Sequence, residues 1–239
     1  MPHRANKAIA TPEKPDFFEV LKNRVPETRK VITNRASGES VCATIPIKIR
    51  TMVVAWGFPL DEVVFSKFFV NYLGLPVMPW DVNLTAQGTY LPDARNIIHE
   101  NFVKNCDAEW LVMLDSDVLP PPNFLDKLLA YKKPLVGGWY RKKGGINNPV
   151  VYDYKGLDAD GKMAWLARAE PGTGLEQVDG AGAGVWLMHR TVAEAIGERP
   201  YDMTRGGEDL ELCLKVTAAG FPIFIDWSIN CAHCGVMYV

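Results

Sequence analysis

The sequence predicts an α/β domain built on a mostly parallel sheet. Short apolar or β-branched runs alternate with amphipathic segments of helical spacing, as in parallel α/β sheets. One run, Trp110–Leu114, is apolar throughout, which suits a strand buried on both faces. At 239 residues the chain is long enough for one such domain with a sizeable core. We expect a single domain at 46–239, preceded by a partly irregular N-terminal arm at 1–45.

The first half of the domain, 46–133, alternates strands with helices. Its expected elements are a strand at 51–56, a helix opened by Asp61 and ended by Gly74, a strand at 75–79, a polar segment at 83–90, a helix at 93–105, a strand at 110–114 and a helix at 123–131. Gly57-Phe58-Pro59 is expected to end the first strand. In a parallel sheet of this kind, ligands bind beyond the carboxyl ends of the strands.

The second half, 134–239, has a different pattern. Its expected elements are strands at 134–140 and 148–154, a hairpin turn at 158–161 leading to a strand at 162–169, a strand at 185–188, a helix at 191–197, a stronger helix at 207–219 and a last strand at 221–225. A basic, glycine-rich segment at 141–145 separates the first two strands. The hairpin signal is Asp158-Ala159-Asp160-Gly161.

Composition excludes some classes of function. The net charge of −2 argues against broad binding to nucleic acid, which needs a basic surface. No apolar run is long enough to span a bilayer, and the N-terminus lacks the apolar segment of a secretory signal, so we expect a cytoplasmic protein. The five cysteines are odd in number, which disfavours a disulfide framework. Cys231 and Cys234 flank His233, and a zinc or redox site there is the alternative to a structural role.

Two carboxylates, Asp115 and Asp117, follow the buried strand at 110–114. Alternate residues of an extended chain point the same way, so the two side chains are able to converge. Neighbouring carboxylates repel unless a cation lies between them, and hard divalent cations prefer carboxylate and phosphate oxygens. The pattern favours a metal with a phosphate-bearing ligand. The alternative is a strand followed by a turn in which one Asp caps the next helix.

Three further groups of residues are candidates for chemistry. Glu208 and Asp209 open a helix, where they either favour the helix dipole or supply a general base. Arg95 lies near a helix N-terminus and is placed to bind an anionic or nucleotide group. The glycines at 180–184 precede a strand and do not open a helix, so they do not fit a dinucleotide fingerprint; close backbone approach to a ligand or a tight bend is the expected role.

Taken in order, these residues resemble the GT-A fold glycosyltransferases of the broad family-2-like group. The resemblance rests on the following motifs: Ala94-Arg95-Asn96, Leu114-Asp115-Ser116-Asp117, the glycines and strand of 179–190, Gly207-Glu208-Asp209, Gly220 and His233. It covers about residues 50–235. It implies a GT-A (nucleotide-diphospho-sugar transferase) fold, with a Rossmann-like sheet flanked by helices, a nucleotide-binding half at 46–133 and an acceptor-side half at 134–239.

The resemblance also implies an activity and the residues that carry it. The activity is metal-dependent, hexosyltransferase-type transfer of a sugar from a nucleotide sugar, most commonly a UDP- or GDP-sugar, to a glycan or other hydroxyl acceptor. The implied metal is Mn²⁺ or Mg²⁺, held by the Asp-x-Asp (DXD) acids and a distal histidine. The implied roles are metal binding by Asp115, Asp117 and His233; donor binding by Arg95, Asp115, Ser116 and Asp117; catalysis by Asp209, the favoured base, with Glu208; and sugar or acceptor binding by Gly182, Gly184 and Trp186.

Two other functions remain open at this point. A nucleotidyltransferase also places carboxylates and metal at an α/β sheet edge, but the segment after the first strand, 56–61, lacks the Lys or Arg of a phosphate loop. An inactive sugar- or partner-binding module of the same fold is the non-catalytic alternative. The family's common Asp-Asp-Gly-Ser-type turn after the second strand is replaced here by Trp80-Asp81-Val82-Asn83.

Overall fold

A computed structural model describes residues 52–60, 64–143, 148–159, 163–203 and 207–234, together with the strands 28–33 and 41–46. The chain divides into two compact units, Met1–Lys48 and Ile49–Val239. In the first unit, β1 (Thr28–Thr33) pairs antiparallel with β2 (Val41–Pro46). The N-terminal arm therefore contains a β-hairpin that the sequence analysis did not predict. The sequence of Phe17–Leu21 is compatible with a short helical turn, and these residues lie outside the described part of the chain.

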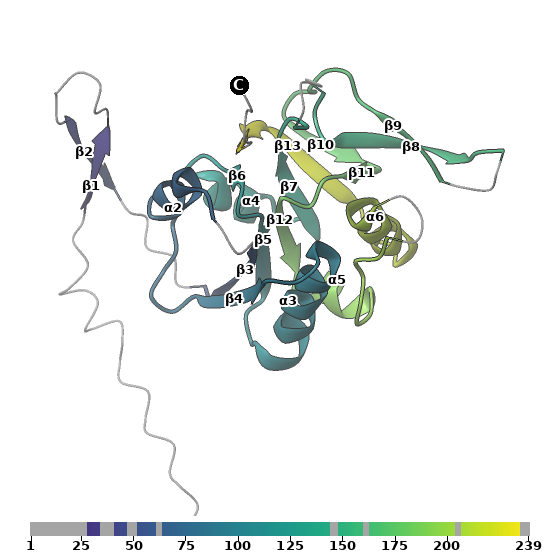
Figure 1. Cartoon of the computed structure of the whole chain (residues 1–239), viewed down its shortest axis with the longest axis horizontal. Coiled ribbons are helices and arrows are strands. Elements are labelled where there is room, and N and C mark those ends of the chain that lie inside the picture. The colour runs from purple at the N-terminus through teal and green to yellow at the C-terminus, as the bar shows by residue number, and fades with distance from the viewer. Residues whose placement is uncertain are drawn as a thin grey trace, which may run out of the picture. The chain divides into compact units, whose positions relative to one another are not determined.

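The second unit is a mixed α/β structure around a seven-stranded sheet of order β10-β13-β7-β12-β5-β3-β4 (Figure 1). The strands are β3 (Val54–Leu60), β4 (Val82–Gln87), β5 (Trp110–Leu114), β7 (Leu135–Trp139), β10 (Leu175–Val178), β12 (Val185–His189) and β13 (Ile223–Asn230). The pairings make β3, β4, β5, β7 and β13 run in one direction, with β12 and β10 opposed to them. The expected mostly parallel α/β sheet is confirmed, and both halves of the domain contribute strands to it.

Helices cover both faces of this sheet (Figure 1). They are α2 (Ser66–Tyr72), α3 (Leu91–Asn105), α4 (Phe124–Tyr131), α5 (Arg190–Ala195) and α6 (Glu208–Ala218). Side chains of α3, α5 and α6 pack in one core cluster, and those of α2 and α4 pack in a second. Strand β5 joins the two clusters, because its residues alternate between them. Among the described residues, no helix is both long and apolar enough to cross a membrane.

Three expectations for the first half are wrong. The helix expected to open at Asp61 begins only at Ser66, with Phe65 as its N-cap residue. Gly57 and Pro59 do not break the first strand but lie inside β3. The pairing of β3 with β5 ends at Gly57. Among the described residues, the stretch around Pro59 therefore pairs with β4 alone, which tolerates a proline. The second strand is β4, in the segment expected to be a polar loop, and not 75–79. Strand β4 is polar because it forms the edge of the sheet and most of its residues reach solvent.

The smaller strands extend the second half. A three-stranded sheet of order β11-β8-β9 joins β8 (Val151–Leu157), β9 (Met163–Ala167) and β11 (Gly180–Ala181). The β8–β9 pair is the hairpin that the turn at 158–161 predicted. A short pair, β6 (Val118–Leu119) with β14 (Ala232–His233), brings the described C-terminal segment back to the end of β5. This last pairing positions His233, as described below.

The packing of α3 on β3 predicts a steric coupling. A Cβ on Gly57 would lie 2.5 Å from Cγ2 of Ile98, closer than real contacts allow. We expect Gly57→Ala to destabilise the fold by about 1–3 kcal/mol in chemical unfolding. In an Ile98→Ala background the same substitution should cost clearly less, because the clashing methyl is gone. Equal costs in the two backgrounds would show that the glycine is needed for another reason.

Candidate active site

The carboxyl end of β5 is where the candidate residues gather. The backbone N–H of Asp115, the first residue after β5, donates to the carbonyl of Gly184 at 3.0 Å. Two residues later, the carbonyl of Asp117 accepts from the N–H of Cys234 at 2.7 Å. Pairing of β14 with β6 sets His233 opposite Val118. Segments separated by more than 60 residues in the sequence thus meet at one edge of the sheet.

Arg95 is the centre of an ion-pair network at this edge. The residue is 1% exposed and comes from the first turns of α3. Its Nη2 donates to both carboxylate oxygens of Asp115, at 2.9 and 2.8 Å. Its Nη1 donates to Glu208 at 2.7 Å and to Asp209 at 2.5 Å. One guanidinium therefore binds three carboxylates, which come from the end of β5 and the start of α6.

Asp209 has the electrostatic character of a base near neutral pH. Burial raises the pKa of Asp209 to about 6; Arg95 opposes this shift, while the negative charges of Glu208 and Asp115 add to it. The Asp209 carboxylate also accepts a hydrogen bond from the backbone of Ala183, between the two candidate glycines. The glycine-rich segment before β12 is thereby tied to the start of α6.

Asp117 faces a different pair of groups. Its Oδ2 accepts from the ammonium of Lys143, and its Oδ1 lies 3.5 Å from Nε2 of His233. Burial tends to raise the pKa of Asp117, but the contacts with His233 and Lys143 outweigh it, so the pKa lies below its usual value. The Nδ1–H of His233 donates to the carbonyl of Arg141 at 2.9 Å, which turns Nε2 toward Asp117.

The donor set at this edge fits a divalent cation in part. Asp117 and His233 offer a carboxylate and an imidazole, and a backbone carbonyl orients the imidazole in the way usual for metal ligands. Both oxygens of Asp115 accept hydrogen bonds from Arg95, so its carboxylate is engaged in the protein's own ion pair. Across the described residues, no three or more His, Cys, Asp and Glu side chains are grouped to hold a metal. Any cation here would need further ligands from a phosphate group or water.

Tyr140 supports the glycine-rich segment. Its hydroxyl accepts from the N–H of Gly184 at 3.1 Å, and its ring meets that of His233 edge-on, with centroids 4.9 Å apart. A Cβ on Gly182 would overlap the Tyr140 hydroxyl oxygen, and a Cβ on Gly184 would lie 2.7 Å from it. These glycines are thus required for close approach to a buried tyrosine, and the approach to a ligand expected from the sequence stays a prediction.

The sequence analysis did not assign site roles to Tyr140, Lys143 or Tyr201. Tyr201 is buried, and the Arg95 guanidinium lies 5.8 Å from its ring centre. The signal available in the sequence was the basic, glycine-rich segment at 141–145, whose Lys143 reaches Asp117. Nothing in the sequence pattern sets Tyr140 or Tyr201 apart from ordinary core aromatics.

Other candidate residues lie away from solvent. Trp186 is 1% exposed and packs in the core cluster that includes α3 and α6. Ser116 is buried between the two aspartates and lines a small pocket of about 100 Å³ beside them, with Pro59 and Ala94. Cys231 is 3% exposed, and burial raises the pKa of its thiol to about 12. Burial thus keeps the Cys231 thiol protonated and unreactive while no metal is bound, as expected of a structural cysteine.

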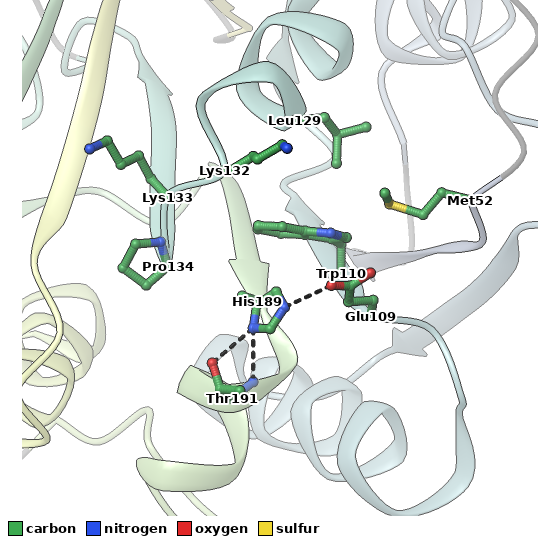
Figure 2. Close-up of a pocket in the computed structure, with 9 residues that line it drawn as sticks. All are labelled: Met52, Glu109, Trp110, Leu129, Lys132, Lys133, Pro134, His189 and Thr191. Atoms are coloured by element: carbon green, nitrogen blue, oxygen red, sulfur yellow. Dashed lines mark hydrogen bonds and ion pairs between the residues drawn. The ribbon is translucent and has the colours of Figure 1, made fainter.

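A larger pocket, of about 490 Å³, lies at the opposite end of β5, where that strand begins (Figure 2). Its histidine, His189, has both ring nitrogens engaged: Nδ1 with Thr191 at the start of α5, and Nε2 with Glu109 at 3.0 Å (Figure 2). Trp110 packs edge-on against the same ring. These contacts cap the start of α5, and none of the candidate residues lines this pocket, so we place the candidate chemistry at the other end of β5.

Comparison with known proteins shows a distant fold relationship. No protein-family model matches the chain, and no curated protein matches it by sequence. Among solved structures, A197 from STIV is similar with a TM-score of 0.58 and 19% identity, over 77% of this chain and 87% of that one. The glycosyltransferase GalNAc-T7, solved with UDP, GalNAc and Mn²⁺, is similar with a TM-score of 0.51 and 12% identity. That match covers 76% of this chain and 44% of GalNAc-T7.

The Arg95 network predicts a pH-dependent loss of stability. Arg95→Met leaves three carboxylates crowded without their cation, which should cost about 3–5 kcal/mol at neutral pH. Without Arg95, the folded-state pKa of Asp209 rises above about 6, because the positive charge that lowers it is lost. Ionisation of Asp209 then destabilises the variant as pH increases above about 6, and this part of the deficit shrinks as pH falls toward 6. Urea unfolding from pH 5 to 8 measures this trend.

Arg168→Met is the matched control. Arg168 also binds two acids, Asp153 at 3.0 Å and Glu176 at 2.7 Å, but all three side chains are partly exposed. We expect its loss to cost only about 0–1 kcal/mol. Equal costs for the two variants would show that burial does not set the importance of Arg95.

Proposed function

We propose that the chain is a metal-dependent glycosyltransferase that moves a sugar from a nucleotide-sugar donor to an acceptor hydroxyl. The observation that carries the proposal is the gathering of Asp115, Asp117, Asp209 and His233 around Arg95 and Lys143, at the carboxyl end of a mostly parallel sheet. The fold relationship to GalNAc-T7, solved with a nucleotide, a sugar and Mn²⁺, supports the same proposal.

Asp117 and His233 are the residues we assign to the donor diphosphate side, with Mn²⁺ or Mg²⁺ as the proposed cation. Such a cation, when bound, offsets the negative charge that develops on the diphosphate as the sugar–phosphate bond breaks. Lys143 is 45% exposed at its side chain and already contacts Asp117, so it is able to reach a phosphate group at that position. We assign Asp115, together with Ser116, to the wall of the donor pocket, where Asp115 also anchors Arg95.

Asp209 is the residue we assign as the general base. An acceptor hydroxyl must lose its proton as it attacks, and a base works best when its pKa lies near the working pH. Burial raises the pKa of Asp209 to about 6, which meets that requirement better than an ordinary aspartate. Arg95 holds Asp209 and Glu208 by the same nitrogen, so it fixes the position of the base relative to Asp115. Arg95 therefore acts in the proposal as a positioning residue, and the predicted direct contact of Arg95 with the nucleotide is not needed.

The two alternatives have less support. A nucleotidyltransferase would usually bring a basic phosphate loop after the first strand, and the described residues of that segment that line the pocket beside Asp115, Pro59 and Leu60, are apolar. A non-catalytic sugar-binding module has no requirement for the costly burial of Arg95 among three acids. Incubation with pyrophosphate and a nucleoside triphosphate tests the first alternative, and turnover assays test the second.

Nucleotide-dependent stabilisation is the first test. A ligand that binds only the folded protein raises its melting temperature by mass action. We expect UDP or GDP to raise Tm by several degrees in the presence of Mn²⁺, as roughly 1–2 kcal/mol of binding would do for a domain of this size. The shift should disappear in Asp117→Asn and persist in Glu109→Gln, which changes an exposed carboxylate at the opposite edge. No shift with any nucleoside diphosphate would contradict the proposal.

The base assignment predicts a separation of binding from turnover. Asp209→Asn should lower transfer by about a hundredfold or more while the donor nucleotide still raises Tm. In the native enzyme, kcat/KM should fall as pH drops below about 6, because Asp209 becomes protonated there. Glu208→Gln, which leaves Asp209 in place, should retain measurable transfer. If Asp209→Asn retains transfer and Glu208→Gln abolishes it, Glu208 is the base.

A further inference from the structure

The aromatic residues of the second half fall into two groups in the structure. Trp139, Tyr140 and Trp186 are at most 5% exposed and belong to the core. Tyr152, Tyr154 and Trp165 are only partly buried and lie on the β8–β9 hairpin, with Tyr154 37% exposed. Core packing explains the first group, whereas the second group lies on a hairpin outside the main sheet and keeps part of its side-chain surface exposed.

The three hairpin aromatics share one face of the β8–β9 sheet. Tyr152 and Tyr154 are two residues apart in β8, and Trp165 of β9 lies directly opposite Tyr154. The rings of Tyr154 and Trp165 are in contact, with centroids 5.0 Å apart and planes tilted by 50°. We call Tyr152, Tyr154 and Trp165 the hairpin aromatic face.

The hairpin aromatic face adjoins the proposed base. Gly180 of β11 pairs with Tyr152, and a Cβ on Gly180 would meet both Trp165, at 2.8 Å, and Leu210, at 3.0 Å. Leu210 follows Asp209 in α6, so the face begins beside the residue that the proposed function uses as base. In addition, burial and the negative charge of Asp209 raise the pKa of the Tyr152 hydroxyl, which places that hydroxyl within electrostatic reach of the base.

Polar contacts hold the hairpin in place. The carboxylate of Asp179 accepts from the backbone N–H of Tyr154 at 2.9 Å. On the opposite face, Arg168 joins Asp153 of β8 to Glu176 of β10. These contacts fix the aromatic rings relative to the sheet that carries the site, so the face is organised before any ligand arrives.

We infer that the hairpin aromatic face binds a carbohydrate acceptor, whose rings stack on Tyr154 and Trp165 while one hydroxyl reaches Asp209. The C–H face of a sugar ring packs well against an aromatic ring, and the tyrosine hydroxyls and Asp179 supply hydrogen-bond partners for its edges. This inference rests on the proposed transferase for the role of Asp209, and it narrows the acceptor from any hydroxyl compound to an oligosaccharide.

The test measures oligosaccharide binding, with no need for turnover. The full chain is titrated with maltotriose, cellotriose, chitotriose and mannotriose, and binding is followed by saturation-transfer NMR. We expect at least one trisaccharide to bind, with saturation strongest on the C–H protons of one ring face. Tyr154→Ala should weaken that binding by roughly fivefold to tenfold, and Tyr154→Phe should largely retain it because the ring remains.

Leu166→Ala is the matched control, because Leu166 lies on the other face of the same hairpin and is 55% exposed. It should change trisaccharide affinity by less than about twofold. Binding by none of the four trisaccharides, or equal losses in Tyr154→Ala and Leu166→Ala, would overturn the inference.

The nucleotide-dependent shift in Tm separates this inference from the proposed function. We expect Tyr154→Ala to keep that shift. If UDP or GDP binds but no trisaccharide does, the transferase proposal stands and the carbohydrate acceptor is wrong. If a trisaccharide binds through Tyr154 but no nucleotide binds, the surface stands and the transferase proposal fails.

Discussion

The ion-pair network around Arg95 is the interaction on which the candidate site depends. Three carboxylates that come from the end of β5 and the start of α6 would repel one another at these distances without a cation between them. A guanidinium suits this place better than an ammonium, because its planar fork donates to Asp115 from one nitrogen and to Glu208 and Asp209 from the other. With Asp117, four carboxylates lie at this end of the sheet, and the cations that bind them are Arg95 and Lys143. The negative charges therefore outnumber the positive ones, and that excess favours a further cation nearby.

The fold supports this network through backbone contacts as much as through side chains. Asp115 is held by a hydrogen bond to Gly184 at the point where β5 pairs with β12, and Ala183 donates from the same segment to Asp209. Tyr140 packs beneath these glycines and against His233. A side chain at Gly182 or Gly184 would displace Tyr140, and through it the imidazole that faces Asp117. The glycines, the tyrosine and the histidine therefore form one packing unit.

From the sequence, the position of the candidate residues at the carboxyl ends of the strands could be predicted better than the contacts that they make there. Asp115 and Asp117 follow a strand that is apolar throughout, and such strands are central in parallel sheets, so their position at the carboxyl edge followed from local pattern. The partners of Arg95 did not follow, because they lie up to 114 residues away and depend on how α6 packs. An arginine near a helix N-terminus has the same sequence pattern whether it binds a ligand or the protein's own acids. Strand β4 was missed for a related reason: an edge strand is polar, and its sequence resembles a loop.

The arrangement of charges suggests how donor binding and the base are linked in the proposed reaction. Asp115 connects the proposed base with the proposed donor side. Arg95 binds Asp115 together with the base, Asp209, and the donor-side residue Asp117 is only two residues further along the chain. The ion pair between Lys143 and Asp117 contributes little to the stability of the fold, because the Lys143 side chain is nearly half exposed and exposed ion pairs are weak. Lys143 is therefore free to move to an incoming phosphate at small cost. Arg95 has no such freedom, since it is buried and leaving would uncover three acids. In the proposed reaction, the exposed cation Lys143 would thus serve the donor side and the buried cation Arg95 the base, so that a charged donor enters while the base keeps its place.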